Sequence, residues 1–150
     1  MRHGDAGFSN GVSDSERGLS VRGTEEIALS ASELIKTGIF PSFMISSPVR
    51  RARETAALMM DCLYQKSPIH NRTDSMAWHY NSHPAAAALD LLAFDSDLMM
   101  VVSHQPLIGD LIWQWCRKRV PVPTGSIYII DYLADRHTIS GQIIHQIQTG

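Results

Sequence analysis

Residues 98–102 form an uninterrupted apolar run with the length of a β-strand. A strand that is apolar at every position has to be covered on both faces, which is typical of parallel sheets between two layers of helices. A shorter apolar run at 43–45 repeats the pattern, and each run is followed by polar residues and then by an apolar stripe at helical spacing. This alternation predicts an α/β fold, a three-layer sandwich with a mainly parallel central sheet.

Four helices are expected, and each begins at a residue that caps or starts helices. Ser20 stands as a cap in front of an apolar stripe, and Gly38 is a stop signal for the same helix. Ser47-Pro48 supplies a cap and a first-turn proline for the helix after the 43–45 strand. The two remaining helices are expected to begin at Pro84 and Pro106.

The other expected strands lie in the middle and at the end of the chain. A short strand is predicted at 69–71. The segments 126–133 and 138–148 are rich in β-forming residues and flank a turn-like stretch at 134–136. This arrangement predicts an antiparallel hairpin at the C-terminal end.

Composition limits the number of domains and the partners. The chain has 150 residues, 44% of them hydrophobic, and its net charge of −2 gives no bulk attraction to nucleic acid or to an acidic membrane surface. Cys62 and Cys116 lack a Cys-x-x-Cys or Cys/His spacing. No apolar stretch reaches the ~18 residues of a membrane span. We expect a single domain over 1–150 in a reducing compartment, the cytoplasm. We expect no contact with nucleic acid or membrane, and the sequence does not determine the oligomeric state.

Three polar clusters fall where an open α/β sheet places its ligand site, at strand ends and helix starts. They are Arg2-His3-Gly4, residues 47–51 and Ser103-His104. The second combines cationic side chains with the free N–H groups of a helix N-terminus, which favours an anion such as phosphate. Two imidazoles with several guanidiniums, and no glycine-rich nucleotide loop or metal-ligand spacing, predict phosphoryl chemistry by side chains without a cofactor or metal.

Motifs around these clusters agree in order and spacing with one family. Arg-His-Gly at 2–4 is followed by Arg-Gly-Leu-Ser-Val-Arg-Gly at 17–23, by Ser-Pro-Val-Arg-Arg-Ala-Arg-Glu-Thr at 47–55 and by Val-Val-Ser-His at 101–104. With them the chain resembles the histidine phosphatase superfamily, whose fold is phosphoglycerate mutase-like. Its short length and the Ser-His-Gln-Pro-Leu-Ile-Gly stretch are most similar to the SixA-type phosphohistidine phosphatases, which lack large helical cap insertions.

The resemblance assigns a role to each cluster. His3 would be the nucleophile that takes the phosphoryl group, and His104 would bind and stabilise that group from the opposite side. Arg2 and Arg51 would complete the phosphate clamp. Arg17 would be a weaker phosphate contact, and family spacing selects Arg51 over the neighbouring Arg50. The expected activity is metal-independent hydrolysis of phosphohistidine on a partner protein through phospho-His3.

The proton donor to the leaving group stays open. Ala77 stands where many family members carry a carboxylate. Asp74, His79 or His83 could donate instead, or no strong donor is needed, because phosphohistidine can leave as neutral imidazole. His79 and His83 also have a spacing that a metal pair can use, but Pro84 opposes a shared helix face and a third ligand is missing.

Two other functions remain open, and so does the start of the chain. The chain could be a broad-specificity or small-molecule phosphomonoesterase, or a phosphate-binding module without turnover. Family members have a strand of about five residues before the Arg-His-Gly triplet, whereas Met1 alone precedes it here. We expect a reading frame that starts upstream, a shortened chain, or a sheet whose neighbouring strands expose unpaired backbone at this place.

Overall fold

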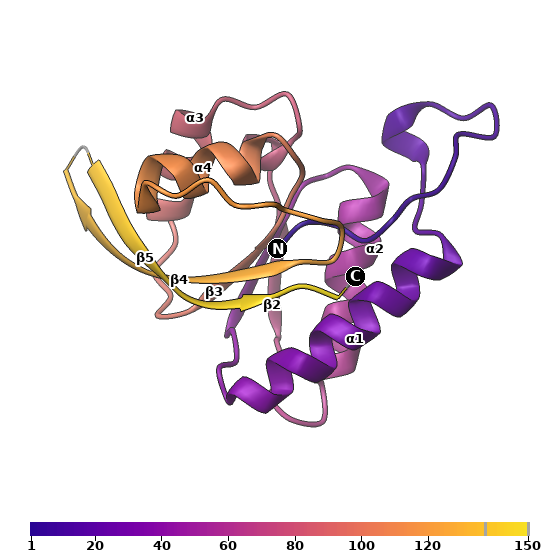
Figure 1. The fold of residues 1–150 in the computed structure, drawn as a ribbon, viewed down its shortest axis with the longest axis horizontal. Helices are drawn as coiled ribbons and strands as arrows, with labels where there is room; N and C mark the ends of the chain where they lie inside the picture. The colour runs from indigo at the N-terminus through magenta and orange to yellow at the C-terminus, as the bar shows by residue number, and fades with distance from the viewer. Residues whose placement is uncertain (137, 150) are drawn as a thin grey trace.

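A parallel three-stranded sheet forms the centre of the molecule. We describe the chain from a computed structural model that covers residues 1–136 and 138–149. The strands are β1 (Phe43–Ser46), β2 (Asn71–Asp74) and β3 (Met99–Val102), in the order β2-β1-β3. β1 is parallel to both neighbours. The predicted α/β fold with a mainly parallel sheet is confirmed (Figure 1).

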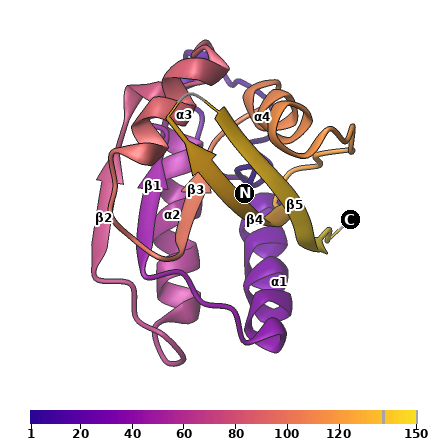
Figure 2. The same cartoon turned by 90° about the vertical axis from the view of Figure 1, so that its left-hand side faces the viewer.

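Helices cover both faces of this sheet (Figure 2). On one face, α1 (Val21–Thr37) and α2 (Arg50–Leu63) pack their apolar stripes against β1 and β3. On the other face, α3 (Pro84–Leu92) and α4 (Leu107–Cys116) form a second core around Trp78. β3 contributes side chains to both cores, which is why its apolar run has no polar alternation.

The residues that begin and end α1 are those that the sequence predicts. The Ser20 side chain accepts a hydrogen bond from the Gly23 N–H at 3.0 Å, which caps the first turn. Gly38 takes a left-handed conformation with φ of 72°, which ends the helix. No helix among residues 1–136 and 138–149 is long and apolar enough to cross a bilayer.

The C-terminal hairpin is also confirmed. β4 (Ile127–Asp135) and β5 (Thr138–Ile147) pair antiparallel, with a register shift between Ile129 and Ile130. The hairpin forms a sheet of its own rather than the edge of the parallel sheet. Between the two sheets lies the short segment 1–3, which hydrogen-bonds to residues at the ends of both.

Two local expectations are wrong. The strand predicted at 69–71 is displaced, because β2 begins at Asn71; its edge position leaves it half exposed, so apolar residues do not mark it. Ser47-Pro48 does not cap α2, since the cap is Val49 and its side chain makes no capping bond. Short helices η1 (Asp14–Glu16) and η2 (Met76–Trp78) lie in segments for which no element was predicted.

Candidate active site

The three polar clusters meet at one end of the parallel sheet. His3 ends the segment beside β3, Ser47 follows β1, and His104 lies just beyond β3. Parallel strands bring their carboxyl ends to the same edge, so these distant residues converge. They surround an open cavity of about 330 Å³. Its lining residues are Arg2, His3, Asp14, Arg17, Arg51, Tyr80, Asn81, His104, Gln105 and Pro106.

His3 is buried and held in one orientation. Its Nδ1 lies 2.7 Å from the Gly4 carbonyl oxygen, which can only accept, so the proton is on Nδ1 and Nε2 carries a lone pair. The Arg51 Nε–H donates to that Nε2 at 3.2 Å. Gly4 is required here, because a Cβ would come within 2.7 Å of the Gly23 carbonyl oxygen. The fold therefore presents a neutral imidazole with its lone pair toward Arg51.

His104 faces His3 across the cavity. The ring centroids are 4.9 Å apart and the rings are tilted by 56°. His104 Nε2 is 2.8 Å from the Ser47 hydroxyl oxygen. Burial lowers the pKa of His104 to about 3, and the nearby His3 and Arg51 act in the same direction. Burial also lowers the pKa of His3, to about 4, so both histidines are neutral near pH 7.

Asp14 organises the guanidiniums at the cavity wall. Its carboxylate accepts from Arg17 at 2.6 Å and from Arg51 at 3.0 Å, and its backbone carbonyl accepts a second bond from Arg51 at 2.7 Å. These hydrogen bonds, that from Arg17 first, hold the pKa of Asp14 below its usual range. Arg51 is only 5% exposed, so its position is fixed by these contacts.

Arg2 and Arg50 differ in what surrounds them. Arg2 donates to the Val122 carbonyl at 2.7 Å and lines the cavity. Within the described part of the chain, two buried side-chain nitrogens have no hydrogen-bond partner, Nε of Arg2 and Nδ1 of His104. Both belong to residues that line the cavity. Arg50 instead pairs with Glu54 at 2.7 Å in an exposed position and does not line the cavity.

The candidate proton donors lie in different places. Asp74 pairs with Arg72 at 3.0 Å and lines a separate surface hollow. His83 caps α3, since its Nδ1 accepts from the Ala85 N–H at 3.1 Å. His79 stacks on the ring of Tyr80, with centroids 4.0 Å apart. None of the three lines the cavity, and the described residues contain no group of three or more His, Cys, Asp or Glu side chains arranged to hold a metal ion.

Two side chains that shape the site, Asp14 and Tyr80, were not predicted from the sequence. Asp14 was not singled out, although its spacing of three residues from Arg17 suits an ion pair. Tyr80 lies edge-on to His104 at 5.5 Å, and its ring is 5.7 Å from the Arg51 guanidinium carbon. Ser47 lies at the site, as its polar cluster predicts, but it contacts His104 and does not cap α2. No pattern marks Tyr80, because only the fold brings its loop to the cavity.

Protonation of His3 leads to a prediction in acid. Burial lowers its pKa to about 4, and Arg51 and Arg2 add to this effect, although the bond to the Gly4 carbonyl opposes it. The unfolded chain has the ordinary histidine pKa of about 6.5. Below that value it binds the proton first, so the free energy of unfolding should decrease as pH falls from about 6.5 toward 4.

The imidazole ¹⁵N shifts of His3, followed by NMR, measure this titration directly. We expect a midpoint near 4, with the neutral form of His3 retained above it. A midpoint near the ordinary 6.5 would contradict the buried, cation-flanked environment.

Fold and site together define an α/β phosphatase with a histidine-rich, cationic cavity. A search of protein-family models finds no match. The chain is 30% identical over 121 residues to phosphohistidine phosphatase SixA of Escherichia coli (strain K12), a match that covers 81% of this chain and 74% of that protein.

Solved structures agree with this relationship. The protein histidine phosphatase SixA complexed with tungstate superposes with a TM-score of 0.85 at 26% identity, over 98% of this chain and 93% of that one. A mycobacterial glucosyl-3-phosphoglycerate phosphatase complexed with VO3 has a TM-score of 0.65 at 16% identity, over 96% and 95% of the two chains, and supports the fold alone. The chain belongs to the histidine phosphatase superfamily, and within it to the SixA type. It is a phosphatase.

Proposed function

We propose that the chain hydrolyses phosphohistidine on a protein, without a metal ion, through a phospho-His3 intermediate. The observation that carries this proposal is the orientation of His3. Its Nδ1–H is bound to the Gly4 carbonyl, and its Nε2 lies beside Arg51 and faces His104. An imidazole held in this tautomer is prepared to attack phosphorus.

The reaction has two displacements. In the first, the Nε2 lone pair of His3 forms a bond to phosphorus while the P–N bond of the substrate breaks, and the substrate imidazole keeps the bonding pair as neutral imidazole. In the second, a water oxygen attacks phosphorus, the P–N bond to His3 breaks, and the pair returns to Nε2. The water loses a proton to solvent and inorganic phosphate is released. Arg2 and Arg51 would bind the equatorial oxygens in both steps, with His104 opposite His3.

The nature of the carboxylates that line the cavity supports a P–N substrate. Of the described residues that line the cavity, Asp14 alone carries a carboxylate. It is bound by Arg17 and Arg51, and its lowered pKa keeps it ionised, so it is a poor proton donor. An alkoxide leaving group needs a donor far more than an imidazole that is already protonated on its distal nitrogen.

Three observations support a protein as the substrate carrier. The cavity is open, and the match to SixA covers most of the chain. Phe8 is 96% exposed on the segment between His3 and Asp14, which both line the cavity. An exposed aromatic side chain beside a site is typical of a protein contact.

The unpaired thiols of Cys62 and Cys116 support a reducing compartment, the cytoplasm.

A substrate panel tests the proposal. We expect kcat/KM for a phosphohistidine peptide to exceed that for a phosphoserine peptide of the same flanking sequence by at least about 10²-fold, because the alkoxide lacks a donor. Steady-state phosphate release with both peptides and a sugar phosphate measures it. Comparable rates on all three would contradict the P–N preference, and a preference for the sugar phosphate would indicate a small-molecule phosphomonoesterase.

A further inference from the structure

An open groove lies between α3, the end of α4 and the tip of the hairpin, three elements that lie close together in Figure 2. We call it the α3 groove; it has a volume of about 610 Å³. Its walls are one face of α3, residues 114, 115 and 117, and residues 136 and 138–140. None of the described residues lines both this groove and the catalytic cavity, so the proposed reaction does not account for it.

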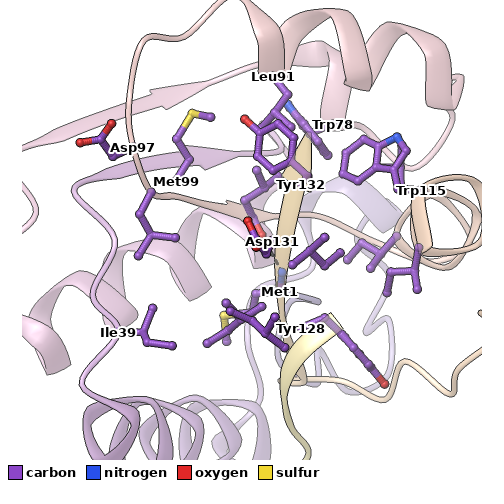
Figure 3. Close-up of a pocket in the computed structure, with 18 residues that line it drawn as sticks. Met1, Ile39, Trp78, Leu91, Asp97, Met99, Trp115, Tyr128, Asp131 and Tyr132 are labelled. Carbon is purple, nitrogen blue, oxygen red and sulfur yellow. Dashed lines mark hydrogen bonds between the residues drawn. The ribbon is translucent and has the colours of Figure 1, made fainter. Parts of the chain in front are cut away.

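The inner face of α3 packs in the core of the molecule. Ala87 and Leu91 are buried there, and Figure 3 shows Leu91 next to Trp78. Asp90 is the one polar residue of this helix. Its carboxylate accepts hydrogen bonds from the Ser75 hydroxyl at 3.0 Å and from the Trp78 indole N–H at 2.8 Å. The polar side chain of α3 is therefore used inside the molecule and does not reach the groove.

The outer face of α3 is apolar as well. Its groove-lining residues follow the spacing i, i+3, i+4, i+7 of a single helical stripe, and they are Ala85, Ala88, Leu89 and Leu92. Leu89 is 71% exposed and Leu92 is 43% exposed. A helix that is apolar all round is normally buried on every side. The outer stripe thus indicates a contact surface for another molecule.

The walls that face α3 are cationic. Arg117 directly follows α4 and Arg136 lies at the tip of the hairpin; both are exposed and line the groove. Among residues 1–136 and 138–149, neither guanidinium forms an ion pair with a carboxylate, and no Asp or Glu lines the groove. The chain as a whole has a net charge of −2. The positive charge is therefore a local property of the groove.

The shape of the groove favours a helix over a bilayer. α3 has 9 residues, so at 1.5 Å per residue its stripe is about 13 Å long. A second helix laid along it makes contact over two to three turns, as helices do in apolar grooves. A flat bilayer surface would touch only the rims of a concave groove.

Charge favours a different protein over a second copy of this chain. In a dimer with two-fold symmetry the same surface of both copies meets, so the arginines of one groove would lie near those of the other. Like charges that face each other across an interface weaken binding. A helix that carries carboxylates would instead pair with Arg117 and Arg136.

We propose that the α3 groove binds an acidic amphipathic helix of a partner protein. The apolar stripe of the partner packs on Leu89 and Leu92, and the small alanine side chains of α3 allow a close approach of the two helices. Carboxylates beside that stripe pair with Arg117 and Arg136. Because the groove and the catalytic cavity have no described lining residue in common, this partner is bound apart from the phosphorylated substrate.

Two peptides of opposite charge test the proposal. One is acetyl-Glu-Glu-Leu-Ala-Glu-Leu-Leu-Ala-Glu-Leu-Glu-Ala-Leu-Glu-amide, and the other has Lys in place of every Glu. We expect the acidic peptide to bind at least about tenfold more tightly in calorimetric titrations, because ion pairs replace like-charge contacts. The net charge of −2 opposes this preference. NMR amide shift changes should centre on Ala85, Leu89 and Ser140, which locates the contact.

Matched variants separate the α3 groove from other surfaces. Leu89→Gln should weaken binding of the acidic peptide by at least about tenfold, because a buried leucine contact is lost. Leu29→Gln changes a leucine of α1 that is 57% exposed and should leave the affinity unchanged. The double variant Arg117→Glu, Arg136→Glu should prefer the basic peptide. Every substituted side chain is exposed, and the Tm of each variant checks that the fold is kept.

Four outcomes would overturn the proposal. The first is equal affinity for the two peptides, and the second is a set of shift changes centred on Arg17 and Asn81 of the catalytic cavity. The third is a wild-type dimer in sedimentation equilibrium that Leu89→Gln dissociates, since a second copy would then cover the groove. The fourth is binding to phosphatidylglycerol vesicles that Leu89→Gln abolishes. Because these readouts measure binding, a failure of the proposed phosphatase mechanism would leave them unaffected.

Discussion

His3→Ala should abolish phosphoenzyme formation and lower kcat by at least about 10³-fold. The variant removes the atom that we propose to bond with phosphorus, and alanine offers no second nucleophile at this place. Incubation with ³²P-labelled phosphoramidate, followed by acid and base treatment, measures the adduct. The wild-type label should be labile in acid and stable in base, as expected for a phosphohistidine.

A histidine outside the site provides the matched control. His70 is exposed just before β2, and His70→Ala should keep both label and activity. Label that persists in His3→Ala would place the nucleophile elsewhere. A wild-type chain that binds phosphate and never forms the adduct would be a binding module rather than the proposed enzyme.

Arg51→Ala should lower kcat/KM by about 10²–10³-fold, the usual loss for one charge-stabilising contact. Arg51 is the residue that contacts both His3 Nε2 and Asp14, so its removal also frees the Asp14 carboxylate beside the phosphoryl site. Single-turnover phosphorylation rates with phosphoramidate measure the chemical step apart from product release.

The neighbouring Arg50 provides the matched control for Arg51. Arg50 carries the same charge one residue away but is exposed and paired with Glu54, so Arg50→Ala should change kcat/KM by no more than about twofold. Arg51→Lys should give an intermediate loss of kcat/KM, because lysine keeps the positive charge but lacks the planar set of guanidinium N–H donors. Equal losses at the two positions would indicate a general electrostatic effect instead of a specific contact.

The sequence predicts the parallel core well, because a strand that is buried on both faces is apolar at every position. The run 98–102 contains β3, and the polar residues after it reach the cavity because strand ends of a parallel sheet share an edge. His3, His104, Arg2, Arg17 and Arg51 all line that cavity. Their catalytic roles are assigned by the family resemblance and stay predictions.

Other parts of the site depend on contacts that no local pattern encodes. Asp14 lies in a short turn whose place is set by ion pairs to Arg17 and Arg51, one of them from α2. Tyr80 reaches His104 from the loop before α3, and nothing in the residues around it marks such a contact. The β2 boundary was displaced because an edge strand is only partly buried.

The division of the β-structure was only partly predictable. The hairpin follows from two β-rich runs and a turn, yet its separation from the parallel sheet is a matter of tertiary pairing.

The short segment 1–3 carries His3, the proposed nucleophile, and also ties the hairpin to the parallel sheet. His104 belongs to the parallel-sheet side, whereas the backbone of Arg2 and His3 is anchored to Gly125 and Ser126 on the hairpin side. The position of His3 relative to His104 therefore depends on backbone contacts with both sheets. We therefore expect the rigidity of β4 and β5, which lie outside the proposed phosphate clamp, to affect how accurately the proposed attacking nitrogen is positioned.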